Sequence, residues 1–323
     1  MNNKPTVTVI MPLFMMEYRL KKAFSSLKNQ TFQDFELIVV DDASPDASVA
    51  IACKLMEEFT DARLITHKSR AGLWEARKAG IMAANGKYIL FLDPREWLDS
   101  DALQRLTESI GESGVDLIQM RRKRFVRRVA VKSENSATVD YNRKIDGEEF
   151  RILSSRIRIN GEISPYCGDK LYRRQLLIEA CSGDFNGNWG EVQILNINYL
   201  RHARSLMFID YAGVNVPWSD DFSNYKFSRL NDFKNLYILK KILGEDLDML
   251  KEELRRNLRY HIRQLLSELA WTPEAVARFM NDELNDPIWK EVGEFFNLEE
   301  IIAAEYSNIR NSTLKTVVTK FIE

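Results

Sequence analysis

The sequence IMAANGKYILFLDPREWL, at residues 81–98, decides the fold of this chain. Its centre, YILFL at residues 88–92, is an uninterrupted apolar run between an Asn-Gly pair and an Asp-Pro pair. A short apolar run bounded by turn residues is typical of a strand buried on both faces of a sheet. Charged side chains follow this run at once, and open α/β sheets bind ligands beyond the carboxyl ends of their strands. The stretch therefore predicts a strand that leads directly into a ligand site.

The neighbouring segments alternate between strand and helix patterns. Apolar runs predict strands at residues 7–11, 35–40 and 63–67, and apolar residues at helical spacing predict helices at residues 17–27, 47–59 and 73–84. The pattern continues with a helix at 101–112, a strand at 115–120 and a helix at 147–155. Strands that alternate with helices of about a dozen residues predict a mostly parallel sheet with helices on both faces. We expect an α/β, Rossmann-like domain.

The composition changes after residue 228. Leucine and isoleucine recur every three or four residues from 236 to 269, which predicts one long amphipathic helix, and shorter helical segments follow. We expect an α/β domain at residues 1–227 and an α-helical annex at residues 228–323. An exposed leucine stripe on the long helix would also favour a homodimer.

The length, composition, net charge and cysteine count exclude several classes of protein. With 323 residues, 45% of them hydrophobic, the chain can bury a full core, and 46 basic against 47 acidic side chains give no argument for nucleic acid. The three cysteines lie far apart without metal-ligand spacing, which predicts reduced thiols and neither disulfide nor zinc. No apolar run is long enough for a signal peptide or a membrane span. We expect a soluble cytoplasmic protein.

A basic run, RRKRFVRR at residues 121–128, follows one predicted strand. Such a run is most often a solvated face. Six neighbouring positive charges would also attract anionic lipid headgroups, by about 1 kcal/mol each close to a membrane surface. We favour a peripheral contact with an anionic membrane or an anionic acceptor for this run.

Two acidic segments at predicted strand ends are the first candidates for chemistry. The pair Asp41-Asp42 could accept hydrogen bonds from a base or a ribose, or it could only form an Asx turn that caps the next helix. The segment from Asp93 to Glu96 could coordinate a hard cation that bridges phosphates, or it could only cap the helix near Asp101. Both alternatives stay open at each segment.

Taken together, these segments resemble the family 2 nucleotide-diphosphosugar glycosyltransferases with the GT-A fold, over about residues 5–225. The matching motifs are VIMPLFMME at 9–17, the spaced residues Ser26, Gln30, Thr31, Phe35 and Glu36, VDDASPD at 40–46 and KLYRR at 170–174. The resemblance implies a GT-A fold and a nucleotide-sugar donor.

The resemblance also implies roles for particular residues. Phe14 would lie against the nucleotide base, Asp42 would accept from its imide, and Asp93 would lie by the ribose or the diphosphate. The full nucleotide-sugar-binding set is Pro12, Phe14, Glu17, Asp42, Arg70, Arg77, Asp93 and Arg95. Glu191 lies in the segment that supplies the catalytic base, and Lys170 would contact the acceptor or the sugar. Apart from the resemblance, Trp189 could stack on a sugar ring, with core packing as the commoner role of such a residue.

The departures from the family pattern matter equally. The family's Asp-x-Asp motif, whose second carboxylate holds Mn²⁺ or Mg²⁺, reads Asp93-Pro94-Arg95, and the Asp of its Glu-Asp base motif is Val192. One interpretation is that Arg95, with Arg70, Arg77 or Lys78, replaces the metal, because a guanidinium binds phosphate oxygens bidentately. Glu191 would then be the base, with Asp184 a weaker candidate.

Two other interpretations remain. The site could have decayed, so that the domain serves as a binding or scaffolding partner of an active transferase, or a metal could bind through Asp93 and Glu96. The function we predict is inverting transfer of one sugar from a nucleotide-diphosphosugar, a UDP-sugar, to a surface glycan such as a lipopolysaccharide or capsule precursor. A lipid-linked acceptor would place the protein at the inner face of the cytoplasmic membrane.

Overall fold

The structure is a computed structural model of the chain. It describes residues 4–111, 114–126, 129–133, 140–160, 166–181 and 191–217, together with 237, 251, 255, 256, 258, 259, 287–297 and 301. The chain divides into two units, Met1–Trp218 and Ser219–Glu323. The residues on both sides of the predicted boundary after residue 227 lie outside the described ones, so that boundary stays a prediction.

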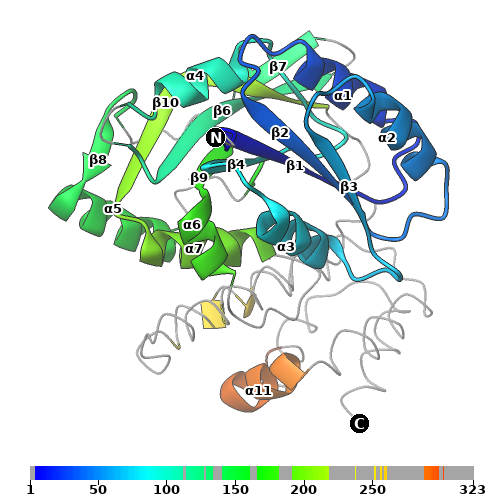
Figure 1. Ribbon diagram of the computed structural model, residues 1–323. Helices are drawn as coiled ribbons and strands as arrows, with labels where there is room; N and C mark the ends of the chain where they lie inside the picture. Colours follow the sequence, from blue (N-terminus) through cyan, green and yellow to red (C-terminus); the bar gives the residue numbers. More distant parts are fainter. Residues whose placement is uncertain are drawn as a thin grey trace. The chain divides into compact units, whose positions relative to one another are not determined.

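One sheet organises the first unit. Within the described residues it has ten strands, eight of them in the order β3-β2-β1-β4-β9-β6-β10-β5, with β7 paired to β6 and β8 paired to β10. Figure 1 shows this sheet between two layers of helices. The expected α/β sheet flanked by helices is confirmed.

The half of the sheet formed first along the chain is parallel. Its strands are β1 (Val7–Leu13), β2 (Phe35–Asp41), β3 (Ala62–Thr66) and β4 (Tyr88–Phe91), in the order β3-β2-β1-β4. Every residue of β1, β2 and β4 is buried. Burial on both faces explains why these strands read as continuous apolar runs.

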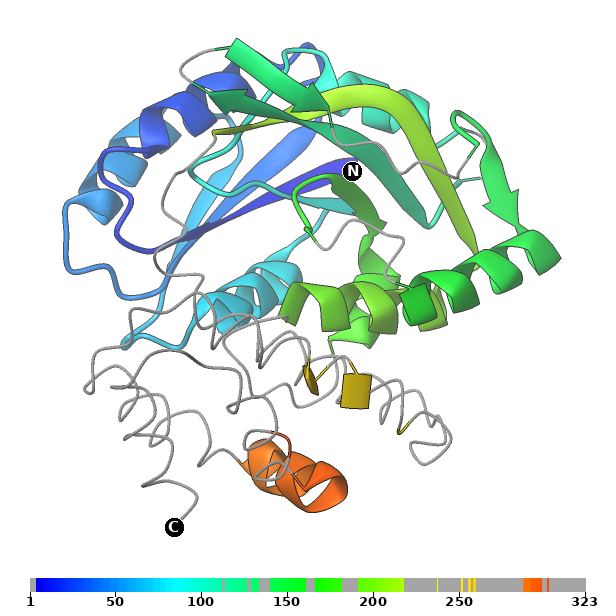
Figure 2. The same ribbon diagram turned by 180° about the vertical axis from the view of Figure 1, so that it is seen from behind.

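Alternate residues of β1 enter two separate cores. Ile10 packs in one core with Trp74 and Ile81 of α3 (Leu73–Ala83), whereas Val9 and Met11 pack in the other with α1 (Leu20–Lys28), α2 (Ser48–Met56) and α4 (Ala102–Glu108). Figures 1 and 2 show α1, α2 and α4 on one face of the sheet and α3, α6 (Arg174–Ala180) and α7 (Glu191–His202) on the other. The two-residue period of a strand produces this division.

The second half of the sheet is mixed. Strand β9 (Lys170–Arg173) lies antiparallel between β4 and β6 (Leu117–Val126), and β10 (Ser205–Pro217) pairs in parallel with β6 and antiparallel with β5 (Trp97–Leu98). The remaining elements are β7 (Val129–Ser133), β8 (Lys144–Asp146) and α5 (Gly147–Asn160). Local patterns predict no strand at residues 168–174, but β9 forms there because strands on both sides satisfy its backbone.

Pro12 ends the hydrogen bonding between β1 and β4 near the two aspartates. The carbonyl of Ile10 accepts from the Leu92 N–H at 2.9 Å, so Ile10, and with it Pro12, points its backbone toward β4. Proline has no N–H to donate the next bond of that ladder. Strand β1 therefore continues to Leu13 against β2, beyond the expected end at Pro12, while its pairing with β4 stops at Ile10.

The turn before β4 is built around a carboxylate. Glu36 is fully buried and accepts hydrogen bonds from the hydroxyl of Thr8 at 2.6 Å and from the N–H groups of Asn85 at 2.5 Å and Gly86 at 3.1 Å. A Cβ at Gly86 would lie 2.6 Å from the Thr8 nitrogen, so only glycine fits. The matched motif residue Glu36 is therefore a structural anchor, because it lies at the amino ends of the strands.

The second unit has few described residues, among them α11 (Pro287–Phe296). There the Tyr237 hydroxyl donates to Glu291 at 3.0 Å, and its ring lies 6.2 Å from that of Phe296. The predicted long helix at 236–269 lies almost wholly outside the described residues. In the part of the chain that is described, no helix has the length and apolar character to cross a membrane.

Candidate functional site

The carboxyl ends of three parallel strands place two aspartates at one edge of the sheet. Asp42 follows β2, and its N–H donates to the carbonyl of Leu13 at the end of β1 at 2.9 Å. Asp93 follows the β4 end, where Phe91 pairs with Ile10 of β1. The two aspartates therefore lie on either side of the end of β1, where a ligand of an α/β sheet binds.

Asp42 is held by the loop that precedes α3. Its carboxylate accepts from the N–H groups of Ala71 at 2.7 Å and Gly72 at 2.8 Å, and it contacts Nδ1 of His67 at 2.9 Å. Burial alone would raise the pKa of Asp42, but these hydrogen bonds hold it below its usual value. Asp42 is thus an ionised acceptor that also fixes the 67–72 loop. The sequence motifs do not point to His67, because its partner Asp42 lies 25 residues away in the chain.

Of the two neighbouring aspartates, Asp41 is the one that forms a turn with its side chain. Asp41 is buried, and its carboxylate accepts from the N–H of Ser44 at 3.2 Å. The two neighbouring aspartates therefore have different tasks. Asp41 shapes the turn after β2, and Asp42 organises the loop on the far side of the strand end.

Phe14 and Arg70 meet beside Asp42. The Arg70 guanidinium lies over the Phe14 ring, 4.3 Å from its centroid, so an aromatic face and a cation from two loops share one place. Glu17 lies in the turn before α1, and its carboxylate accepts from the N–H of Ala47, directly before α2, at 3.1 Å. Among these predicted residues, Phe14 and Arg70 could contact a ligand directly. Glu17 instead holds the loop after β1 against the start of α2.

Asp93 binds Arg95 in a two-pronged ion pair. Nε of Arg95 lies 2.9 Å from one carboxylate oxygen, and the terminal nitrogen Nη2 lies 2.9 Å from the other. Burial alone would raise the pKa of Asp93, but the hydrogen bonds and charge of Arg95, with a further contribution from Arg77, hold it below its usual value. Arg77 itself is buried on α3. The structure thus brings Arg70, Arg77 and Arg95 to the edge that carries the two aspartates.

A second, buried group of charges supports this edge. Glu96 pairs with Arg122 of β6, and Lys170 of β9 pairs with Asp169 at 2.7 Å. Burial raises the pKa of Glu96, Arg122 opposes the rise, and the charges of Asp93 and Asp169 add to it, so the pKa is about 7. Sequence reasoning missed Arg122 and Asp169, because pairs formed across a sheet leave no local signal.

Lys170 differs from what we expected. Its side chain is fully buried, and its amine donates to Asp169 and to the carbonyl of Tyr166 at 2.5 Å. Burial lowers the pKa of this amine, which Asp169 partly offsets. An amine engaged in this way supports β9 and is not placed to bind an acceptor.

The carboxylates near the strand ends are paired with arginines, so a metal at this place stays a prediction. Both oxygens of Asp93 are taken by Arg95, and the next carboxylate, Glu96, is paired with Arg122. A metal such as Mn²⁺ or Mg²⁺ needs free carboxylate oxygens. Among the described residues there is also no group of three or more His, Cys, Asp or Glu side chains able to hold a metal.

The predicted base segment is described in part. Helix α7 begins at Glu191, whose backbone is described but whose side chain is not. Trp189, the other residue predicted in this segment, and Asp184 lie outside the described residues. Their roles stay predictions.

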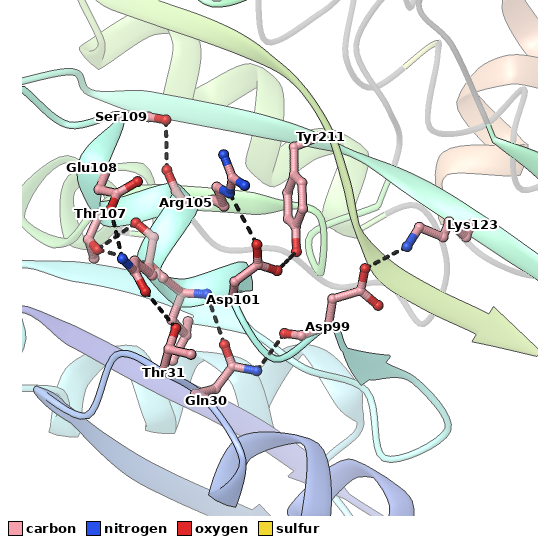
Figure 3. Close-up of polar contacts among 12 residues, drawn as sticks. Gln30, Thr31, Asp99, Asp101, Arg105, Thr107, Glu108, Ser109, Lys123 and Tyr211 are labelled. Carbon is pink, nitrogen blue, oxygen red and sulfur yellow. Dashed lines mark hydrogen bonds and ion pairs between the residues drawn. The ribbon is translucent and has the colours of Figure 1, made fainter.

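Three cations of the basic run are paired within the protein. Arg121 pairs with Asp210, Arg122 with Glu96, and Lys123 with Asp99 at 2.5 Å. Figure 3 shows Lys123 directed at Asp99 and, beside it, Tyr211 directed at Asp101. Residues 121–126 of the run belong to β6, which continues past the expected end at residue 120. These three cations are therefore engaged within the protein, which favours the structural alternative.

Comparisons with known proteins identify relatives of this chain. The chain is 38% identical over 117 residues to the uncharacterized glycosyltransferase EpsJ of Bacillus subtilis, covering 35% of this chain and 33% of that protein. It is 31% identical over 109 residues to a GalNAc(5)-diNAcBac-PP-undecaprenol beta-1,3-glucosyltransferase of Campylobacter jejuni, covering 33% of this chain and 35% of the relative. Each match thus spans about a third of the relative's length.

The fold is that of solved glycosyltransferase structures. The crystal structure of S. aureus TarS 1-349 in complex with UDP-GlcNAc aligns with a TM-score of 0.62 at 19% identity, covering 98% of this chain and 91% of that one. At this identity the likeness shows the fold alone. The model of the family described as glycosyl transferase family 2 matches residues 8–179, more than half of the chain. The chain therefore belongs to glycosyl transferase family 2.

Proposed function

We propose that the protein transfers one sugar from a nucleotide-diphosphosugar to a glycan acceptor. The observation that carries the proposal is the meeting of Asp42 and Asp93 with Arg70, Arg77 and Arg95 at one edge of the sheet. An aromatic ring, an ionised acceptor and a cluster of cations are the chemistry that a base and a diphosphate need.

The donor is, in this proposal, a UDP-sugar. Phe14 would lie against the base and Asp42 would accept from its imide. A solved TarS structure of the same fold contains UDP-GlcNAc, which supports a uridine nucleotide. The carboxylate of Asp42 already receives three protein contacts, and an ionised carboxylate offers about four lone-pair sites. One acceptor site is therefore left for the base.

The arginines would stabilise the leaving diphosphate. The acceptor hydroxyl attacks the anomeric carbon, the new glycosidic bond forms as the bond to the diphosphate oxygen breaks, and the nucleoside diphosphate leaves with the electron pair. Arg95 would exchange Asp93 for diphosphate oxygens, since the pair is exposed and a guanidinium is always charged. Arginine would thus take the task that a metal has where the second motif residue is aspartate.

The proton of the acceptor hydroxyl needs a base. Glu191 remains our candidate, because it is the carboxylate at the family's base position and begins α7. Attack from the face opposite the diphosphate inverts the anomeric centre. Replacing this base with Gln should slow transfer by about 10²- to 10⁴-fold.

The acceptor in our proposal is a surface glycan precursor, and a lipid-linked one would place the protein at the inner face of the cytoplasmic membrane. The name of the Campylobacter relative, which acts on a glycan on diphosphoundecaprenol, supports an acceptor of this kind. We do not base a membrane contact on Arg121, Arg122 and Lys123, because each is paired within the protein.

Calorimetry with UDP tests the donor site. Binding should be saturable in EDTA, and Arg95→Ala should weaken it about tenfold or more, since a hydrogen bond to a charged group contributes about 1.5–3 kcal/mol. Arg105→Ala is the matched control, because Arg105 is also exposed and paired with a nearby aspartate, Asp101. Asp42→Ala is a poorer probe, because it would also release the loop at Ala71 and Gly72.

Donor hydrolysis distinguishes the remaining interpretations. Hydrolysis that continues in EDTA and is lost in Arg95→Ala supports the arginine mechanism. Hydrolysis that EDTA abolishes and Mn²⁺ restores would show that a metal is required. Absence of binding to UDP and to other nucleotides, with or without Mn²⁺, would favour the inactive scaffolding homologue.

A further inference from the structure

A concave site lies at the edge of the sheet opposite the two aspartates. It is a cavity of about 920 Å³ whose wall includes Asp116, directly before β6, Arg173 at the end of β9, and Ser205 at the start of β10. Arg173 pairs with Tyr88, the first residue of β4. The cavity therefore borders the amino ends of β4, β6 and β10, whereas Asp42 and Asp93 follow carboxyl ends.

The cavity wall is rich in cations. Its lining contains five basic residues, Lys144, Arg151, Arg173, Arg201 and Arg204, and two acidic residues, Asp116 and Asp146. The carboxylate of Asp116 accepts from Nε of Arg173 at 2.7 Å and from the N–H groups of Arg204 at 2.7 Å and Ser205 at 3.1 Å. These donors compensate its charge, so Asp116 opposes an incoming anion only weakly.

Two arginines of this wall are available to a ligand. Arg201 lies in the last turn of α7, Arg204 follows that helix, and both are exposed. Neither side chain has a hydrogen-bond or ion-pair partner among the described residues. By contrast, Arg173 is paired with Asp116, and Arg151 is paired with Glu148. Two unengaged guanidinium groups on one cavity wall are suited to bidentate binding of phosphate oxygens.

The start of α5 adds a further favourable element. This helix of 14 residues begins at Gly147 on the cavity wall, and the N-terminus of a helix attracts anions. A Cβ at Gly147 would meet nothing within 4 Å, so the backbone there is open. Glu148 and Glu149 in the same turn are paired with Arg151 and Arg143 and do not line the cavity.

We propose that this cavity is a second anion-binding site, which takes a diphosphate or phosphodiester group through Arg201 and Arg204. It is separate from the proposed donor site, because the length of β4 and its neighbours lies between the two edges. A phosphate group of this kind could belong to a soluble phosphodiester or to a lipid headgroup, and the experiment distinguishes these sources.

The test titrates inorganic pyrophosphate into the full chain by calorimetry. An Arg95→Ala background removes one of the three arginines at the other edge and so weakens the competing site. In that background pyrophosphate should bind, and adding Arg201→Ser with Arg204→Ser should weaken binding about tenfold or more, because each lost charged hydrogen bond costs about that factor. The binding should also weaken as salt is raised.

The matched control is Lys21→Ala with Lys54→Ala in the same background, which removes two exposed cations from α1 and α2, away from the cavity. This control should leave pyrophosphate binding unchanged, and thermal melting should show that all variants are folded. Absence of pyrophosphate binding, or an equal loss in the control, would overturn the proposal.

Flotation with phosphatidylglycerol vesicles identifies the source of the phosphate. Vesicle binding that is lost with Arg201→Ser and Arg204→Ser supports a lipid headgroup in the site. Pyrophosphate binding without vesicle binding supports the site with a soluble ligand. Neither substitution touches the proposed donor site, so failure here would leave the proposed transfer activity untouched.

Discussion

Two arginine–carboxylate pairs lie side by side in this protein and differ in their access to water. In the pair of Asp93 and Arg95, the side chains are 23% and 54% exposed, whereas in the pair of Glu96 and Arg122 they are 11% and 5% exposed. An exposed pair is weak and can exchange one partner for a ligand, whereas a buried pair cannot lose a partner without leaving an uncompensated charge. Similar chemistry thus gives a ligand-facing pair and a supporting pair.

Removal of the buried cation should have the largest effect. Arg122→Ala would leave Glu96 buried beside Asp93 and Asp169 without its counter-charge. We expect the free energy of unfolding to fall by about 3–5 kcal/mol, measured by urea denaturation. The matched double variant Glu96→Leu with Arg122→Met removes both charges and should recover most of this loss. A loss below about 1 kcal/mol in Arg122→Ala would place this pair in the same class as exposed pairs.

The buried pair should also make stability depend on pH. The folded pKa of Glu96 is about 7, above its ordinary value of 4.5, so between these values the folded protein binds more protons than the unfolded chain. Stability should therefore be highest below pH 4.5, as far as this group is concerned, and fall as the pH rises through 7, by about 3 kcal/mol.

Urea denaturation at pH 5 and pH 8 checks this expectation. Glu96→Gln cannot titrate, so its unfolding free energy should fall less between the two values than that of the original chain. Equal pH dependence in both proteins would mean that Glu96 is ionised throughout and fully compensated by Arg122.

Loss of the exposed pair of Asp93 and Arg95 should affect ligand binding more than stability. Arg95→Ala should change the free energy of unfolding by less than about 1 kcal/mol, because an exposed ion pair contributes little. The same substitution should weaken UDP binding, as proposed above. Denaturation and calorimetry on one preparation check both parts, and a large stability loss with unchanged UDP affinity would reverse our assignment of the two pairs.

The smallest effect is expected at Lys123. Its pair with Asp99 is about one third exposed on each side, and Asp99 also accepts from the side chain of Asn215 at 2.7 Å. Lys123→Ala should therefore cost about 0.2–1 kcal/mol of unfolding free energy. A cost as large as that of Arg122→Ala would show that partial exposure does not weaken such a pair.

Much of the parallel half of the fold follows from local patterns. The apolar runs at β1, β2 and β4 and the Asn-Gly turn before β4 could be identified, because burial on both faces and turn residues leave a signal in consecutive residues. Strand β9 could not, since four residues form a strand only when β4 and β6 lie on both sides. The annex prediction falls largely outside the described residues.

The candidate site divides in the same way. Motif positions identified Asp42 and Asp93, but they did not separate ligand-facing residues from supporting ones. Lys170 and Arg95 are both cations at motif positions, and only their burial shows that the first is enclosed and the second is accessible. His67 was missed because its contact with Asp42 joins two loops.

By itself the sequence determined the order of strands and helices in the parallel half of the sheet, the two acidic strand ends and the replacement of a motif carboxylate by Arg95. These features depend on residues that are close together in the chain. The tertiary structure alone decided which charges meet, which of them are removed from water, and that a basic cavity forms at the other edge of the sheet. Electrostatic energies depend on distance in space and on burial, and the one-dimensional order of residues specifies neither quantity.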